Sequence, residues 1–101
     1  MIVPRFDPDA SSEFLAAIQY YEDCRPKLGK RFRDAVKDAV RKVCESPLSY
    51  RVVRKPFRKC LVQRFPYSII YAVERDHILI IAVAHAKRRP GFWHSRTSKH
   101  T

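Results

Sequence analysis

The residues with the clearest chemical potential lie near the end of the chain, directly after an apolar run. Residues 78–84 are all apolar, and His85, Arg88, Trp93 and Arg96 follow them. An imidazole can act as a general acid or base near neutral pH, guanidinium groups bind phosphates or carboxylates, and an indole can stack on an unpaired RNA base. The cluster therefore predicts a surface for an anionic partner, either RNA or an acidic protein.

Two interpretations of this cluster are open. Cleavage of RNA by its 2′-hydroxyl needs proton transfer and cations that stabilise the transition state, so His85 is the candidate acid or base and Arg88 and Arg89 are candidate phosphate ligands. In the other interpretation, His85 only caps the end of its strand and Trp93 folds back over the edge of the sheet. Arg96 is then a solvated charge or one that faces a protein partner.

The composition predicts one globular, strongly basic domain. The chain has 101 residues, of which 46% are hydrophobic, and a formal net charge of +11. An apolar fraction of this size excludes a disordered chain, and the length suits a single core. Residues 1–50 carry nine Lys/Arg and eight Asp/Glu, whereas residues 51–101 carry twelve and two, a net charge of +10. We therefore expect the binding surface in the second half, where the positive field attracts polyanions.

Residues 51–64 form a basic segment without any acidic residue. It can track phosphates, receive an acidic protein segment, or serve as a solvated basic edge that discourages strand-to-strand aggregation. Its cations are Arg51, Arg54, Lys55, Arg58, Lys59 and Arg64.

Hydrophobic spacing predicts a strand and two helices in the first half of the chain. Residues 2–6 are a short strand, which Pro4 limits to a sheet edge or to the first pairings of a strand. Asp7 and the proline after it are typical of a helix start, and apolar residues at three- and four-residue spacing then indicate helices over residues 8–23 and 28–45.

Four short strands are expected in the second half, at residues 50–54, 58–65, 67–74 and 78–86. The last shows no alternation of apolar and polar residues, so both its faces should be covered. The order of elements predicts an α+β fold: an N-terminal strand, a helical hairpin, then a three- to four-stranded mainly antiparallel sheet whose other face is free to bind. Residues 1–96 should form this single domain, and the polar residues 97–101 should fray.

The three cysteines, Cys24, Cys44 and Cys60, are odd in number and widely spaced. This pattern predicts reduced thiols and neither a zinc nor a redox site. We expect no metal and no cofactor. Because no segment resembles a signal peptide or a membrane span, we expect a cytoplasmic protein without a membrane partner.

Several short motifs follow one another along nearly the whole chain. They are Tyr20-Tyr21, Leu28-Gly29 before Phe32, Ser46-Pro47, the basic strand around Arg58, Phe65-Pro66-Tyr67, Ile70-Tyr71, and Ala82-Val83-Ala84-His85 with Arg88 and Pro90. In order and spacing they resemble the RelE/ParE superfamily of type II toxins, often labelled plasmid stabilisation proteins. The resemblance implies the toxin fold of that superfamily and a growth-arresting toxin neutralised by an antitoxin, which would be acidic, partly disordered when free, and folded on the toxin's surface.

The superfamily contains ribosome-dependent mRNA endonucleases of the RelE kind and DNA gyrase inhibitors of the ParE kind, so the fold alone does not choose between them. RelE-like nucleases present several cations from the middle strands and a tyrosine near the C-terminus. In this chain Leu61 and Ser68 stand at two of the cation positions, and Trp93 or His94 stands near the tyrosine position. Lys59 and Arg88 remain possible matches.

The element from His85 to Arg88 resembles the ParE branch more closely. We therefore expect a non-enzymatic inhibitor of DNA gyrase. The alternatives are a ribosome-dependent mRNA endoribonuclease that uses His85, Arg88 and Lys59, and a non-toxic relative that only binds an antitoxin. Candidate contacts to the target or the antitoxin are Arg54, Arg58, Arg64, Arg89, Trp93 and Arg96.

Overall fold

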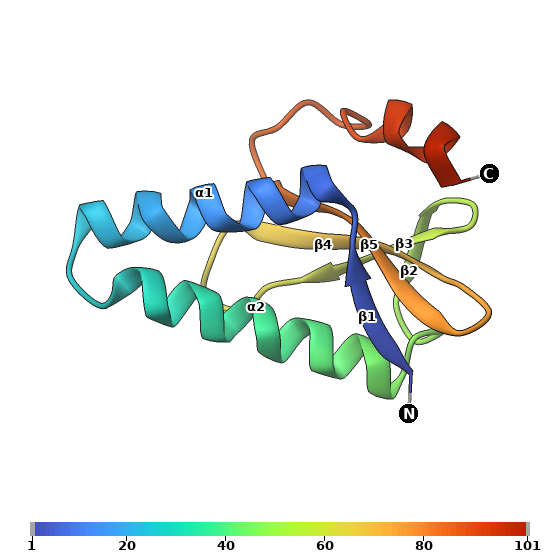
Figure 1. The fold of residues 1–101 in the computed structure, drawn as a ribbon, viewed down its shortest axis with the longest axis horizontal. Coiled ribbons are helices and arrows are strands. Elements are labelled where there is room, and N and C mark those ends of the chain that lie inside the picture. Colours follow the sequence, from blue (N-terminus) through green and yellow to red (C-terminus); the bar gives the residue numbers. More distant parts are fainter. Residues whose placement is uncertain (1, 101) are drawn as a thin grey trace.

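The structure is a computed structural model that describes residues 2–100. Its elements are β1 (Val3–Phe6), α1 (Pro8–Cys24), α2 (Leu28–Glu45), β2 (Arg51–Arg54), β3 (Phe57–Leu61), β4 (Tyr67–Val73), β5 (His77–His85) and a 3-10 helix at His94–His100 (Figure 1). The α+β order predicted from the sequence is confirmed. Of the tail at 97–101, residue 101 lies outside the described residues and the others belong to the final 3-10 helix.

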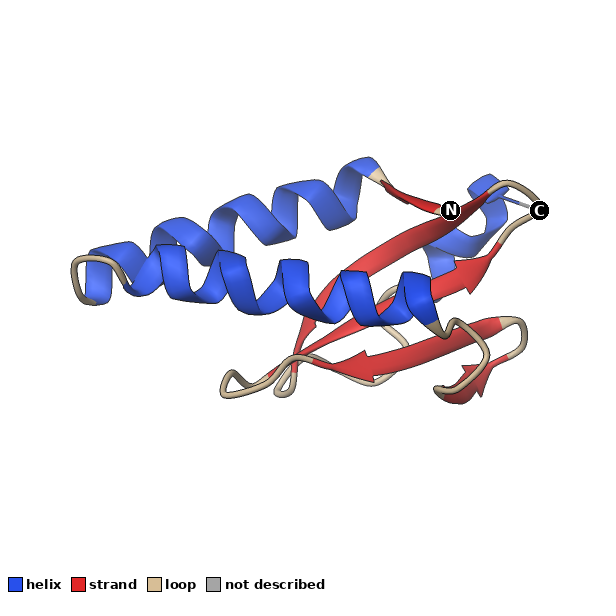
Figure 2. Cartoon of the chain, turned by 90° about the horizontal axis from the view of Figure 1, so that it is seen from below, coloured by secondary structure: helices blue, strands red, loops and turns tan. Residues whose placement is uncertain are grey.

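The strands form one five-stranded sheet in the order β1-β5-β4-β3-β2. β1 runs parallel to β5, and every other neighbouring pair is antiparallel. β1 is an edge strand, as Pro4 predicted, because a proline cannot donate to a further strand. The two long helices lie side by side on one face of this sheet (Figure 2).

The helical hairpin depends on local contacts that the sequence encodes. Asp7 caps α1, since its Oδ1 accepts the backbone N–H of Asp9 (2.9 Å). The carboxylate of Glu22 accepts the backbone N–H of Gly29 (3.1 Å), one of the unpaired amides at the start of α2. A Cβ at position 29 would lie 2.6 Å from the backbone oxygen of Ile18, so glycine is what lets the two helices approach there.

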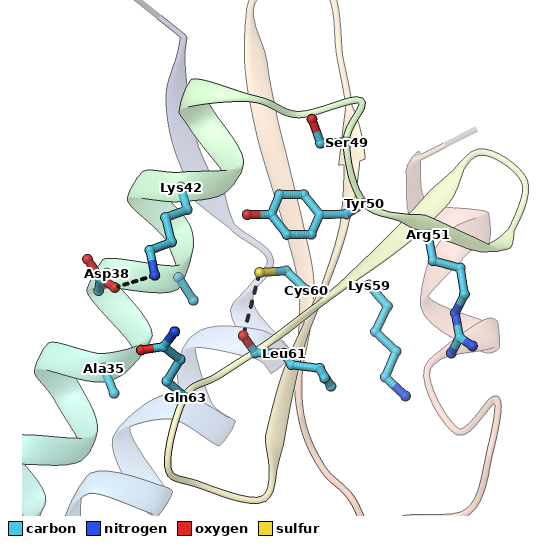
Figure 3. A pocket seen from close by; sticks show the side chains of 11 residues that line it. Ala35, Asp38, Lys42, Ser49, Tyr50, Arg51, Lys59, Cys60, Leu61 and Gln63 are labelled. Carbon is cyan, nitrogen blue, oxygen red and sulfur yellow. Dashed lines mark hydrogen bonds and ion pairs between the residues drawn. The ribbon is translucent and has the colours of Figure 1, made fainter.

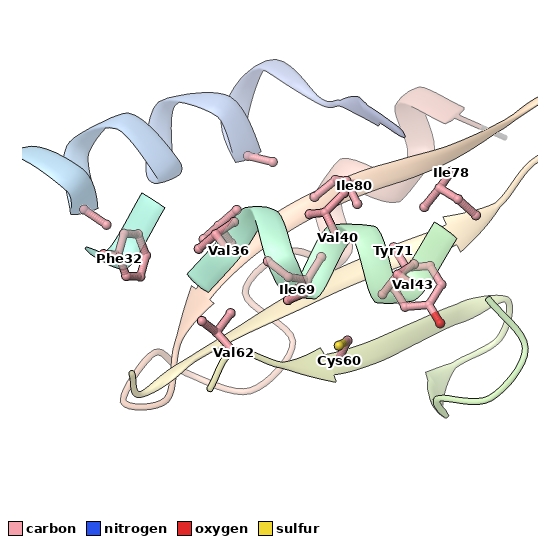
Figure 4. Close-up of a cluster of buried hydrophobic side chains, with 14 residues drawn as sticks. Phe32, Val36, Val40, Val43, Cys60, Val62, Ile69, Tyr71, Ile78 and Ile80 are labelled. Carbon is pink, nitrogen blue, oxygen red and sulfur yellow. The ribbon is translucent and has the colours of Figure 1, made fainter. Parts of the chain in front are cut away.

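The main core lies between the helices and the sheet (Figure 4). It is built from the apolar side of α2 and from residues of β4 and β5 that face it. These buried residues include Phe32, Val36, Val40, Val43, Ile69, Tyr71, Ile78 and Ile80. Their burial removes a large apolar area from water, which is the dominant favourable term in folding.

The opposite face of the sheet is covered in part by the end of the chain, so only the part of this face beside that segment, along β2 and β3, is free as expected. Residues 86–97, here called the strap, fold back after β5 through a turn in which Gly91 has a φ of 78°. Trp93 of the strap is only 5% exposed. It joins a second buried cluster with Phe57, Ile70, Ala72, Ile81 and Ala82. A short segment can cover this face because an indole and its neighbours supply enough apolar area.

The pairing of β5 with β4 shifts by one residue midway along β5. Ile70 pairs with Ala82 and Tyr71 with Ile80, which leaves Ile81 as an extra residue. Such a bulge reverses which side chains face which side of the sheet. Ile80 and Val83 accordingly both face the helices, whereas Ile81 and Ala82 face the strap. Two features therefore explain why β5 shows no alternation of apolar and polar residues: both of its faces are covered, and the bulge interrupts the alternation.

Candidate binding groove

A groove of about 400 Å³ lies between the strap and the sheet. We call it the strap groove. Its floor is uncharged and its rim is basic, and no carboxylate occurs among the described residues that line it. The lining residues are Arg51, Val53, Lys59, Ser68, Ile70, Ala84, His85, Ala86 and, along the strap, Arg88 to His94.

Two of the rim cations are direct neighbours across strands. Arg51 of β2 pairs with Lys59 of β3, and both line the strap groove. Figure 3 shows both side chains pointing away from α2, on the other side of β3 from Asp38 and Lys42. Like charges directly opposite each other destabilise a sheet. The pair is therefore better explained by an anionic partner than by the needs of the fold.

The opposite wall of the strap groove carries Arg88 and Arg89, both exposed. The guanidinium of Arg88 lies over the ring of Phe92, 3.9 Å from its centroid. Its Nη1 also lies 3.7 Å from a carboxylate oxygen of Glu13. Stacking and charge together hold this cation at the wall while leaving about half of its side chain exposed.

His85 stands at the end of the strap groove, but its ring turns to the helix side of the sheet. The ring packs edge-on against Tyr67, with the centroids 5.0 Å apart. Nδ1 accepts the backbone N–H of Lys87 (2.9 Å), so the histidine caps the end of β5. Because Nδ1 accepts this hydrogen bond, the proton of a neutral ring is on Nε2.

Three further predicted contact residues lie outside the strap groove. Arg58 donates to the backbone oxygens of Tyr50 (2.7 Å) and Leu48 (3.3 Å), so it fixes the chain before β2. Arg64 is exposed in the β3–β4 turn, where it borders a hollow beside the start of α2. Arg54 donates to Nδ1 of His94 (2.9 Å) and thereby ties β2 to the strap.

Two predicted contact residues belong to the interior. Trp93 packs against Phe57 with ring centroids 5.3 Å apart, so it is not available to stack on a nucleic-acid base. Arg96 pairs with Glu13 through two hydrogen bonds of 2.9 and 2.8 Å, and its side chain is only 13% exposed. These hydrogen bonds raise the pKa of Arg96 above its usual range. The interpretation of Arg96 as a solvated or partner-facing charge was wrong.

Sequence reasoning gave no role in this region to two residues that shape it, His94 and Glu13, and it named Arg51 only as one cation of the basic segment 51–64. Arg51 and His94 line the strap groove. Glu13 was detectable, because it stands at the helical spacing of Ala10 and Ala17, both buried, where a carboxylate needs a partner. No sequence pattern indicates which cation that partner is.

Besides the hollow next to Arg64, two further hollows that are larger than the strap groove flank α2. One, of about 620 Å³, lies between α2 and β3 and contains Tyr50 and Cys60 (Figure 3). Burial raises the pKa of the Cys60 thiol, which keeps it protonated and unreactive. The other, of about 640 Å³, is mostly apolar and lies between β1 and α2, with Phe6 and Val40 in its wall. Neither contains any of the chemically promising residues from the end of the chain.

All three cysteines are free thiols. Among the described residues, no group of three or more His, Cys, Asp or Glu side chains is placed to hold a metal ion. Within residues 2–100, no helix has the length and apolar character needed to span a membrane.

Comparison with known proteins identifies the family. A family model described as the ParE toxin of the type II toxin–antitoxin system, parDE, matches residues 5–90. A solved chain from the chromosomal ParDE toxin–antitoxin system of P. aeruginosa has the same fold, with a TM-score of 0.74 and 15% sequence identity over 84% of this chain and 96% of that chain. None of the curated proteins compared with the sequence matches it. Because the family match covers most of its length, the chain belongs to the ParE toxin family and is the toxin of a type II toxin–antitoxin system, with an antitoxin as its partner.

Proposed function

We propose that this toxin arrests growth by binding DNA gyrase through the strap groove, without carrying out a covalent reaction itself. Gyrase inhibition is the role typical of the ParE branch, which this chain resembles. Since DNA gyrase acts in the cytoplasm, we propose that the toxin acts there too.

The observation that carries the proposal is the charge pattern of the strap groove. Arg51 and Lys59 face each other across β2 and β3, Arg88 and Arg89 stand on the opposite wall, and no described lining residue is acidic. Local features that lower the stability of a fold are found mostly at sites where the protein binds a partner. An anionic protein surface would relieve this repulsion on binding.

A supercoiling assay with purified gyrase and relaxed plasmid tests the proposal. The variants Lys59→Glu and Arg88→Glu should each raise the inhibitory concentration about tenfold, because each places a like charge against an anionic surface. Arg75→Glu is the matched control, with the same charge change on an exposed residue of the β4–β5 turn, at the other end of β5 from His85. Full supercoiling at toxin concentrations that arrest growth in cells would contradict the proposal.

A ribosome-dependent endoribonuclease is the second candidate, because Lys59, His85 and Arg88 all line the strap groove. Two observations weigh against it. The side chain of His85 turns toward Tyr67 on the helix side, whereas Lys59 lies on the strap side with its pairing partner Ile70. Ser68 and Ala84 on the groove floor are uncharged, so the cations stand only on the rim, and none comes from the β4 position where RelE-like nucleases present one.

Mapping of mRNA 5′ ends after induction separates the two candidates. New ends inside translated codons that disappear in His85→Ala and Arg88→Ala, with gyrase unaffected, would replace the gyrase proposal by the nuclease. Intact mRNA together with inhibited gyrase would exclude the nuclease.

We also propose that the antitoxin is acidic and partly disordered when free, and that it folds on the basic half of the toxin. Residues 51–101 carry a net charge of +10, and all four residues of the edge strand β2 are exposed. Binding of the adjacent gene's product should weaken as salt rises, because exposed charges are screened. Salt-independent affinity would contradict this electrostatic contribution.

A further inference from the structure

A buried ion pair joins the strap to the first helix. Glu13 of α1 and Arg96 of the strap form a two-pronged contact, with N···O distances of 2.9 and 2.8 Å. Their side chains are only 15% and 13% exposed. Asp9 adds a second carboxylate, 3.6 Å from Nε of Arg96. A bidentate contact of this kind fixes orientation as well as distance. The far end of the strap is therefore held in one position on α1.

The same pair satisfies the backbone of β5 where β1 stops. The pairing of β1 ends at Phe6, and the amide of Asp7 then bonds to the backbone oxygen of Ile80 (2.8 Å). Farther along, the N–H of Val83 donates to Oε1 of Glu13 (3.1 Å), and Arg96 donates to the oxygen of Ile81 (3.1 Å). Buried backbone groups need such partners. Glu13 and Arg96 thus take the place of a longer β1.

Glu13 also lies close to Arg88, which forms part of the wall of the strap groove. Its Oε2, which pairs with Arg96, lies 3.7 Å from Nη1 of Arg88. The ring of Phe92 lies beside both guanidinium groups, with centroid distances of 3.9 Å to Arg88 and 5.2 Å to Arg96. One carboxylate therefore sets the position of two cations and of the aromatic ring that they share.

We propose that Glu13 is a positioning residue of the toxin, which holds the strap and Arg88 in the geometry that binds the target. The proposal rests on the strap groove being the target-binding surface, as proposed above. Without the carboxylate, Arg96 is a nearly buried cation without its main partner, an arrangement that proteins avoid. The strap would then detach as a local unit, while the helices and the sheet remain folded.

The experiment uses Glu13→Gln, Arg96→Lys and the double variant Glu13→Gln/Arg96→Gln, which removes both charges of the central pair together. Asp23→Asn is the matched control, with the same loss of charge on an exposed residue of α1. Trp93 is the only tryptophan of the chain, so its fluorescence reports on the strap alone. Far-UV circular dichroism identifies variants that retain the fold.

In the folded variants, acrylamide quenching of Trp93 should rise about twofold or more and amide exchange in residues 86–97 should quicken about tenfold, because local opening exposes the strap. Growth arrest and gyrase inhibition should both need about tenfold more of the variant toxin, because the strap and Arg88 are no longer held in the geometry that binds the target. The control should match the wild type in all four measurements.

Two results would overturn the inference. One is quenching and exchange as low as in the wild type, which would show that Glu13 does not hold the strap. The other is a loosened strap with growth arrest at the wild-type dose. If the variants lose growth arrest but the wild-type toxin never inhibits gyrase, the positioning role stands and the gyrase proposal fails.

Discussion

Replacing Trp93 with alanine should destabilise the protein by about 3–4 kcal/mol. The indole is 5% exposed and packs against Phe57. Removing about 200 Å² of buried aromatic surface at about 25 cal/mol per Å² corresponds to about 5 kcal/mol. A compact denatured state already buries part of this area, which lowers the value to about 3–4 kcal/mol. That is a large share of the roughly 5–15 kcal/mol typical of a domain.

Urea denaturation followed by far-UV circular dichroism measures this loss without relying on the tryptophan that is removed. Leu61→Ala is the matched control, since Leu61 is 71% exposed and its neighbour across the strands, Ser68, lines the strap groove. The control should change the free energy of unfolding by no more than about 0.5 kcal/mol.

A loss below about 1 kcal/mol for Trp93→Ala would refute the packing argument, because buried aromatic truncations cost several times that amount. It would mean that the strap covers the sheet without stabilising it. The indole would then again be a candidate for contact with a partner.

Three further predictions concern single residues. Gly29→Ala should lower the calorimetric melting temperature, because the new Cβ would lie 2.6 Å from the backbone oxygen of Ile18 and overpacking costs about 1–3 kcal/mol. An unchanged melting temperature would contradict this close approach of the two helices. Asp7→Ala should cost about 1 kcal/mol in urea denaturation, the usual value of an N-cap, whereas a loss near zero would mean that the cap bond to Asp9 contributes nothing. Burial raises the pKa of Tyr71 to about 12, so the unfolded chain, with a pKa near 10, loses this proton first. The free energy of unfolding should therefore fall by roughly 2 kcal/mol between about pH 10 and 12. In melting experiments, Tyr71→Phe should lack this part of the decline. Parallel curves of stability against pH for the wild type and the variant would contradict the prediction.

Local signals predicted most of the fold. The Asp7-Pro8 start and the Ser46-Pro47 stop bracket two helices whose observed ends lie within one residue of those expected. β3 was expected to reach residue 65 but ends at Leu61. The chain leaves the strand there because the amide of Val62 bonds to the oxygen of Tyr67 (2.9 Å), which closes a turn. Apolar residues beyond a strand's end do not reveal such a closure.

The site was less accessible to sequence reasoning, because its walls depend on contacts between distant parts of the chain. The sequence indicated that Arg88, Arg89 and Lys59 belong to a binding surface, and they do line one groove. Nothing local indicated that Arg96 would pair with Glu13, since no pattern links two residues so far apart. Residues 86–97 have no helical or strand periodicity. The interpretation in which Trp93 folds back over the sheet is confirmed, but the contacts that hold the rest of this segment were not predicted.

The extra residue in β5 decides what kind of surface this toxin presents. Side chains alternate along a strand, so a one-residue shift exchanges the faces of everything that follows it. With Ile81 as the extra residue, His85 lies on the same side as Val83, facing the helices. A strand of the same composition without the bulge would turn that imidazole into the groove beside Lys59. In this fold, adding or removing one residue in β5 would therefore move a proton-transfer group out of or into the binding groove.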